Sequence, residues 1–238
     1  LHPVEKRLEA INTAGNNTFL LNSKDVFMDM LTDSGVNAMS DRQQAAMMIA
    51  DDSYAGSDTF LRLHSKLKDV FELDYFLPAH QGRACENIIA QTYVKDGLIV
   101  PMNYHFTTTK AHIEKNGGSI VELIIDEGLK VTSDFPFKGN MDIDKLKDFI
   151  KDQGREKIAF IRMEAGTNLI GGQPFSLQNL KDVKEVCNHN KILLVLDASL
   201  LSDNLYFIKE REEEYKDKSI RDISREIAAQ CDIVYFSG

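Results

Sequence analysis

The chain has 238 residues, a formal net charge of −9 and 43% hydrophobic residues, enough to build one large α/β core. The negative charge argues against nucleic acid and anionic membranes as partners, because both require a basic face. No apolar run of about 20 residues predicts a membrane span. The widely spaced Cys85, Cys187 and Cys231 fit neither a metal site nor a disulfide framework, and free thiols favour a reducing cytoplasm.

The first 40 residues differ in character from the rest of the chain. They show no regular strand–helix alternation, and Thr32-Asp-Ser-Gly35 is typical of a loop. We therefore interpret residues 1–40 as an N-terminal arm that packs with a small domain or a partner subunit. Residues 41–238 are interpreted as one large domain.

From about Tyr75 onward, short apolar runs alternate with amphipathic stretches. The apolar runs predict strands over residues 75–78, 98–101, 120–125, 158–163, 192–196 and 233–236. The stretches between them predict helices over residues 81–94, 108–116, 143–152, 177–188 and 220–229. Several runs are apolar almost throughout, as in strands that are buried on both faces. The pattern predicts an α/β fold with a mostly parallel sheet flanked by helices.

Polar residues follow five of the predicted strands, and ligands of parallel sheets bind outside the carboxyl ends of the strands. These positions are residues 80–83, residues 103–109, Asn168, Asp197 and Ser237. Their convergence predicts a ligand site at this edge of the sheet without identifying the ligand.

Two of these positions suggest what the ligand carries. Gly82 allows close approach to the N-terminus of a helix, which suits an anion, although an ordinary strand–helix turn would look the same. Asp197 ends the most apolar strand, so its carboxylate needs a cationic partner such as a protonated pyridine nitrogen, unless it caps the following helix. The chain contains no glycine-rich dinucleotide or Walker pattern, which disfavours a nucleotide-binding domain.

Seven segments, in order and at compatible spacing, resemble the β-eliminating lyases, the family of tyrosine phenol-lyase and tryptophanase. They are residues 16–25, 31–35, 54–57, 80–83, 106–109, 171–174 and 204–209. The resemblance runs from about Asn16 to the last residue. It implies a pyridoxal-phosphate-dependent, aminotransferase-like (fold type I) large domain with an N-terminal arm. It also implies a cytoplasmic homotetramer built as a dimer of dimers.

The resemblance implies a role for each matching residue around pyridoxal 5′-phosphate. The cofactor-binding residues would be Gln81, Gly82 and Ser237 at the phosphate with Arg83 alongside, Phe106 stacked on the ring, Asn168 at the ring hydroxyl and Asp197 at the ring nitrogen. A protonated ring nitrogen lets the cofactor act as an electron sink.

The family pattern also implies residues for the substrate and for a monovalent cation, K⁺. Thr32 and Ser34 would hold the substrate carboxylate, and Gly35 and Asp52 would bind the cation. Tyr54 would reach in from a neighbouring subunit as the general acid that protonates the leaving ring.

The implied activity is carbon–carbon bond cleavage by β-elimination of an aromatic amino acid. Thr107 is implied as a catalytic and substrate-binding residue facing a phenol hydroxyl, which favours conversion of L-tyrosine to phenol, pyruvate and ammonia. Residues 215–218 favour the alternative, conversion of L-tryptophan to indole, pyruvate and ammonia. A paralogue that binds the cofactor but has altered or no lyase activity is a further alternative.

Three features depart from the family pattern. Leu200 stands where the family has an Arg, and it can neither carry a charge nor donate a hydrogen bond. Asp52 replaces a Glu, which shortens one proposed cation ligand. The chain also ends just before the lysine to which the family attaches the cofactor, so we expect a fragment that is incomplete at the C-terminal end of the large domain.

Overall fold

The computed structural model describes residues 2–29 and 39–237, which form two compact units, Leu1–Thr59 and Phe60–Gly238. The first unit contains α1 (Val4–Thr13), the 3₁₀ turns η1 (Thr18–Leu20) and η2 (Ser23–Asp25), and α2 (Asp41–Met48). Ser40 and Gln43 form a reciprocal capping pair at the N-terminus of α2. The predicted boundary near Ser40 falls inside the first unit, which extends to Thr59. The predicted loop Thr32–Gly35 lies outside the described residues.

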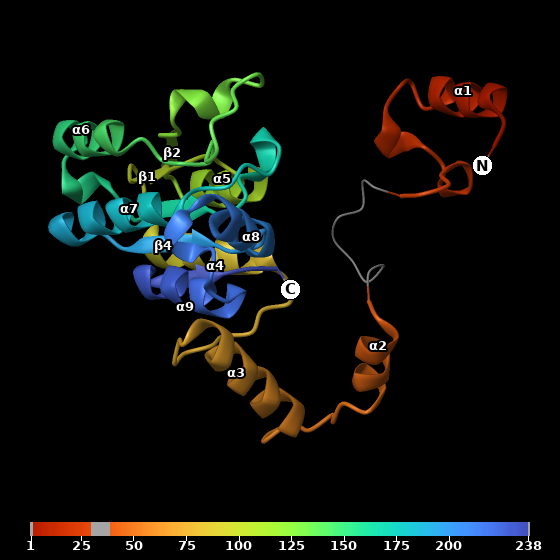
Figure 1. The fold of residues 1–238 in the computed structure, drawn as a ribbon, viewed down its shortest axis with the longest axis horizontal. Helices are drawn as coiled ribbons and strands as arrows, with labels where there is room; N and C mark the ends of the chain where they lie inside the picture. The colour runs from red at the N-terminus through yellow and green to blue at the C-terminus, as the bar shows by residue number, and fades with distance from the viewer. Residues whose placement is uncertain (1, 30–38, 238) are drawn as a thin grey trace. The chain divides into compact units, whose positions relative to one another are not determined.

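The second unit is built on a five-stranded sheet with helices around it (Figure 1). The strands are β1 (Ile99–Met102), β2 (Ser119–Glu122), β3 (Ile161–Glu164), β4 (Leu194–Asp197) and β5 (Ile233–Tyr235). The helices are α3 (Asp58–Phe71), which begins in the first unit, α4 (Gly82–Tyr93), α5 (Thr107–Lys115), α6 (Ile143–Gln153), α7 (Leu177–Asn190), α8 (Leu201–Arg211) and α9 (Ile220–Gln230). Short 3₁₀ turns are η3 (Asp126–Leu129), η4 (Arg155–Lys157), η5 (Asn168–Ile170) and η6 (Glu213–Tyr215).

All strand pairs in this sheet are parallel, and the strand order is β2-β1-β3-β4-β5. The predicted parallel α/β fold is therefore confirmed. The chain moves from β1 outward to β2, crosses back to β3, and then continues in the opposite direction through β4 to β5. The direction reverses between β1 and β3, and ligands of open parallel sheets bind at the carboxyl ends beside such a reversal.

Two apolar clusters cover the opposite faces of the sheet. On one face Ile161 and Leu196 belong to the cluster that contains the buried sides of α6, α7, α8 and α9. On the other face Val100 and Val195 pack with residues of α4 and α5. Burial on both faces is why the central strands read as continuous apolar runs.

One predicted strand was wrong: residues 75–78 do not form a strand. Tyr75 is 96% exposed and Leu77 is 71% exposed, whereas Phe76 stacks on Phe60 and His64 of α3. The segment is therefore held by alternate side chains against a helix rather than by a strand partner. Pro78 lacks a backbone N–H, so it cannot donate a hydrogen bond to a neighbouring strand.

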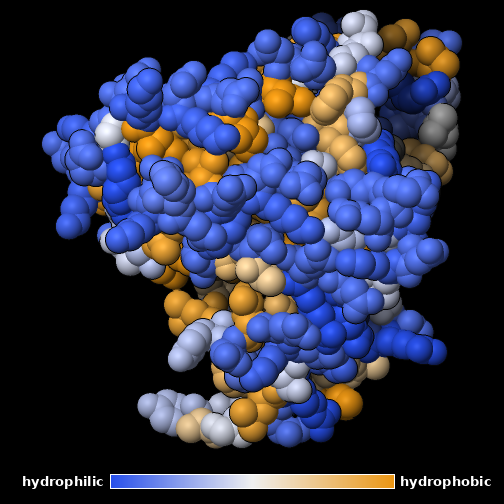
Figure 2. Space-filling model, turned by 60° about the vertical axis from the view of Figure 1, so that its left-hand side comes forward, coloured by the Kyte–Doolittle hydropathy of each residue, from blue (hydrophilic) through white to orange (hydrophobic). Residues whose placement is uncertain are grey.

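The other five predicted strands and all five predicted helices are found within a few residues of their expected ranges. Helices α1, α2, α3 and α8 were not predicted, and the first three have no buried residue among those described. No described helix combines the length and apolar character needed to cross a membrane. The surface in Figure 2 is mostly hydrophilic with smaller hydrophobic areas, in keeping with 27% charged residues.

Candidate functional site

Four polar side chains lie on the sheet face that α4 and α5 cover. Because successive strand residues point to opposite faces, Arg162 and Glu164 lie opposite to the core residues Ile161 and Met163 of the same strand. Asp197 pairs in register with Glu164 on one side and with Tyr235 on the other. The last residues of three neighbouring strands, together with Arg162, thus form one polar row at the carboxyl edge of the sheet.

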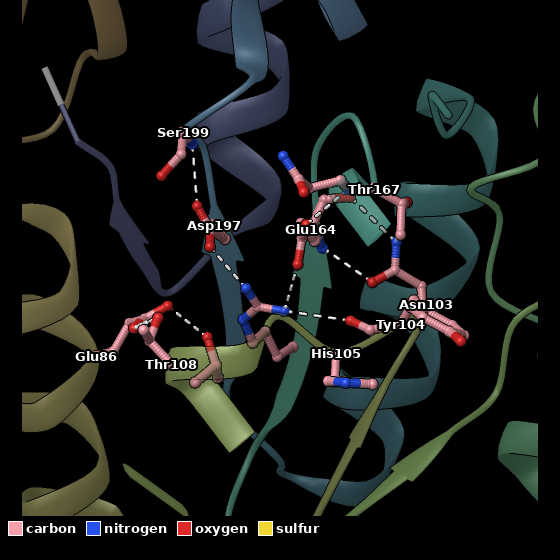
Figure 3. Close-up of polar contacts among 12 residues, drawn as sticks. Glu86, Asn103, Tyr104, His105, Thr108, Glu164, Thr167, Asp197 and Ser199 are labelled. Atoms are coloured by element: carbon pink, nitrogen blue, oxygen red, sulfur yellow. Dashed lines mark hydrogen bonds and ion pairs between the residues drawn. The ribbon is translucent and has the colours of Figure 1, made fainter. Parts of the chain in front are cut away.

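Asp197 is the centre of this row, and its carboxylate is only 5% exposed. Its Oδ2 accepts hydrogen bonds from Arg162 Nη2 at 2.6 Å and from Tyr235 Oη at 3.0 Å. Its Oδ1 accepts one from the backbone N–H of Ser199 at 3.0 Å. Asp197 is therefore not the cap of α8, which begins at Leu201 after Leu200. Figure 3 shows Asp197 with the bond from Ser199, and Glu164 beside it.

Arg162 is only 1% exposed and lies between the carboxylates of Glu164 and Asp197. Its Nη1 donates to Glu164 Oε2 at 3.0 Å, and its Nε donates to Tyr235 Oη at 3.0 Å. Burial alone would lower the pKa of Arg162, but Tyr235, Glu164 and Asp197 outweigh it and hold the pKa well above its usual value. Burial raises the pKa of Glu164, and the charge of Arg162 opposes that rise. The cation and the carboxylates therefore depend on one another.

Glu164 and Asn103 connect this group to the loop that follows β3. The second carboxylate oxygen of Glu164 accepts a hydrogen bond from the backbone N–H of Asn168 at 2.9 Å. Asn103 directly follows β1, is fully buried, and bonds both the N–H and the carbonyl of Glu164. Side chains thus fix the position where the sheet reverses direction, and Figure 3 shows Asn103 and Glu164 there. Asn168 begins the turn η5 that follows.

The predicted phosphate-binding residues come together at the N-terminus of α4. A Cβ added to Gly82 would lie 3.0 Å from Ser237 Cβ and 3.2 Å from its backbone nitrogen, so glycine permits this close approach. Ser237 N donates to Ser199 Oγ at 3.3 Å, which links it to the segment after Asp197. Gln81 precedes the helix and contacts His80, while Arg83 is exposed in the first turn.

Helix α5 presents Phe106 and Thr107 at its N-terminus, as the cap residue and the first helical residue. Phe106 is half-buried and Thr107 is exposed. The helix is tied to α4 because Thr108 and Thr109 each donate to the buried carboxylate of Glu86 at 2.5 Å. The N-termini of two helices are therefore held together over the same face of the sheet.

The remaining predicted residues belong to the first unit or lie outside the described residues. Tyr54 is fully exposed on a loop that closes on Asp51, whose carboxylate accepts bonds from Ser57 Oγ and from the N–H groups of residues 58 and 59. Hydrogen bonds from Thr59 hold the pKa of Asp51 well below its usual range. Asp52 is exposed on the same loop. Three predicted positions fall in the undescribed segment, namely Thr32, Ser34 and Gly35.

Among the residues that the structure describes, no group of three or more His, Cys, Asp or Glu side chains could hold a metal ion. The predicted cation ligands therefore stay a prediction. Sequence reasoning also missed three members of the polar row, Arg162, Glu164 and Tyr235. Charged residues two positions apart in an otherwise apolar strand, on the same face as Asp197, were the available signal.

The loop that carries Asn168 depends on a buried amide of α8, and this gives a first prediction. Asn204 is fully buried; its Oδ1 accepts from the N–H groups of Gly166 and Phe175, and its Nδ2 donates to the Phe175 carbonyl. We expect Asn204→Ala to destabilise the protein by about 2–4 kcal/mol because it leaves buried backbone groups unpaired. The measurement is chemical unfolding beside Asn188→Ala, at an exposed site on α7. Equal effects of the two substitutions would contradict this role.

Comparisons with known proteins identify relatives over most of the chain. A family model described as beta-eliminating lyase matches residues 29–238. Tyrosine phenol-lyases of Pasteurella multocida and of Symbiobacterium sp. are 46% and 45% identical over 234 residues, which is 98% of this chain and 51% of each relative. The chain thus spans about half the length of the curated relatives it matches.

A solved structure from Exiguobacterium, described as an aromatic amino acid beta-eliminating lyase/threonine aldolase, has a similar fold. Its TM-score is 0.52 at 19% identity, with 84% of this chain and 49% of that chain covered. This structural similarity confirms the predicted aminotransferase-like (fold type I) fold.

Proposed function

The chain belongs to the β-eliminating lyase family, and from this we propose that the full-length protein is a pyridoxal-phosphate-dependent lyase that cleaves L-tyrosine to phenol, pyruvate and ammonia. The observation that carries the proposal is the row of side chains around Asp197, beside the Gly82–Ser237 contact at the N-terminus of α4. Together they offer a buried carboxylate for a cation and a helix terminus for an anion.

The described residues fit pyridoxal phosphate on two counts. An ionised carboxylate has about four acceptor positions, and the three hydrogen bonds that Asp197 accepts use three of them, with one left on Oδ1. That position suits a protonated ring nitrogen. The backbone approach at Gly82, which a side chain would obstruct, suits a phosphate at a helix N-terminus.

In this proposal the residues bind and orient the reacting groups. Gln81, Gly82 and Ser237 hold the phosphate with Arg83 alongside, Phe106 covers the ring, and Asn168 donates to the ring hydroxyl. The bound cofactor supplies an electron sink for the carbon that loses its proton. The opposite charge of Asp197, a residue that is 5% exposed, would keep the ring nitrogen protonated.

The substrate end of the proposal rests on the resemblance. Thr107, exposed at the start of α5, faces the phenol hydroxyl. Tyr54 of a neighbouring subunit would donate a proton to the carbon of the leaving ring, so that the ring departs as a neutral phenol. The same basis supports a cytoplasmic homotetramer, with Thr32 and Ser34 as ligands of the substrate carboxylate and Gly35 and Asp52 as K⁺ ligands. The alternative function is cleavage of L-tryptophan in place of L-tyrosine.

The test is pyruvate release from L-tyrosine and from L-tryptophan, assayed side by side on the full-length protein with pyridoxal phosphate and K⁺. We expect pyruvate from tyrosine in large excess over tryptophan, with phenol formed in equal amount. A Leu200→Arg variant is assayed in parallel, since Leu200 lies beside Gly166, two residues before Asn168: a Cβ added to Gly166 would lie 2.9 Å from Leu200 Cβ. Cofactor bound without pyruvate from either substrate would contradict the lyase assignment.

A further inference from the structure

We propose that Arg162 is a positioning residue for the cofactor: it fixes the orientation of the Asp197 carboxylate directly and, through Glu164, the position of Asn168. This inference rests on the proposed function and deepens it. The family resemblance assigned no role to Arg162, Glu164 or Tyr235. Their contacts with one another and with Asp197 are all between buried groups.

The first argument is the distribution of acceptor positions on Asp197. Arg162 Nη2 and Tyr235 Oη both donate to Oδ2, and this oxygen is thereby directed toward the sheet. Oδ1 receives one backbone N–H, from Ser199. With two lone pairs on each oxygen, the remaining acceptor position lies on Oδ1. Without Arg162, the Asp197 carboxylate could rotate into the space that the guanidinium group leaves. The ring nitrogen would then no longer face an oxygen held in one orientation.

The second argument is the charge of the group. One guanidinium lies between two carboxylates, at 2.6 Å from Asp197 Oδ2 and 3.0 Å from Glu164 Oε2. The charges of Arg162, Asp197 and Glu164 sum to −1, so one further cation makes the group neutral. Buried charges are stable only when they are paired and hydrogen-bonded. A protonated ring nitrogen at Asp197 meets this requirement.

The third argument is the link to Asn168. Arg162 holds one oxygen of Glu164, and the other oxygen holds the backbone N–H of Asn168 at 2.9 Å. Arg162 Nη1 also donates to the carbonyl of Tyr104 at 3.3 Å, two residues before Phe106. One side chain therefore connects the segments that carry three predicted cofactor contacts. A fork of several donors does this, and lysine cannot replace it.

The test compares cofactor binding in variants that keep the charge of the group. Removing Arg162 alone leaves two buried carboxylates without their cation, so that variant can fail to fold. The double variant Arg162→Met/Glu164→Gln leaves the charge of the group at −1. The matched control is Arg225→Met/Glu72→Gln, which also keeps the charge of its group at −1, because Arg225 joins two carboxylates, Asp69 and Glu72, on α9 beside α3.

The readouts on full-length protein are pyridoxal phosphate affinity, the pH titration of the bound cofactor's absorbance, and the unfolding temperature without cofactor. We expect Arg162→Met/Glu164→Gln to fold, to bind pyridoxal phosphate at least about tenfold more weakly and to shift the titration. Arg225→Met/Glu72→Gln should keep the wild-type affinity and titration. In an Asp197→Asn background the same double change should weaken binding by less than it does in the wild-type protein, because one of the two residues through which Arg162 acts is already altered.

The outcomes separate this inference from the proposed function. Wild-type affinity and titration in a folded double variant would overturn the positioning role, even if pyruvate is released. Weaker binding and a shifted titration without pyruvate from the wild-type protein would support the role of Arg162 and overturn the lyase assignment. No cofactor binding by the wild-type protein would overturn both.

Discussion

Replacing Asp197 by asparagine is expected to lower lyase turnover of the full-length protein by on the order of 10²–10³-fold, the range for removing one preorganised electrostatic partner of a reacting group. Asparagine keeps the size of the side chain but loses the charge that holds a ring nitrogen protonated. Arg162 keeps Glu164 as its partner in the variant, so the fold should survive. Turnover and circular dichroism, measured together, check both expectations.

The matched control for this variant is Asp232→Asn. Asp232 lies just before β5, at the opposite edge of the same sheet, and pairs with Lys184. Its loss should leave turnover within about twofold, because it is remote from the carboxyl edge. If Asp197→Asn retained wild-type turnover, or if both variants lost activity equally, Asp197 would not be the cofactor's partner.

Replacing Gly82 by valine is expected to weaken pyridoxal phosphate binding by 100-fold or more. The added Cβ alone would lie 3.0 Å from Ser237 Cβ, and the branched methyl groups would push the N-terminus of α4 away from Ser237. The phosphate site needs both segments at once, so a small displacement removes several contacts together. A fluorescence titration of the protein without cofactor measures the affinity.

Thr92→Val, on the exposed side of the same helix, is the control for this substitution. It introduces the same residue into α4 but contacts neither Ser237 nor the helix N-terminus. We expect it to bind the cofactor with wild-type affinity. Wild-type affinity in Gly82→Val would show that the close approach of α4 and Ser237 is not the phosphate site.

The sheet was predictable because its central strands are buried on both faces. Runs such as 192–196 contain almost no polar residue, and the helices between the runs carry clear apolar stripes. Because ligands of parallel sheets bind at the carboxyl ends of the strands, the sequence predicted one site with Asp197, Asn168, Gly82 and Ser237. In the structure, Gly82 and Ser237 lie in contact. These inferences need only the local pattern and the topology of a parallel sheet.

The polar row could not be predicted by the same reasoning. Arg162 lies inside an apolar run, and composition alone does not show that it contacts Asp197 of the neighbouring strand. Its partners are set by the register of β3 against β4, which only the folded sheet fixes. Likewise, the run 75–78 has the composition of a strand but packs on α3, because burial by a helix and burial in a sheet leave similar apolar patterns.

The most direct test of the account is a crystal structure of the full-length protein with pyridoxal phosphate bound. We predict the ring nitrogen within hydrogen-bond distance of Asp197 Oδ1, with Oδ2 still bonded to Arg162 and the phosphate at the N–H groups of α4 beside Ser237. A cofactor bound elsewhere, or one whose ring nitrogen faces a group other than Asp197, would contradict the account.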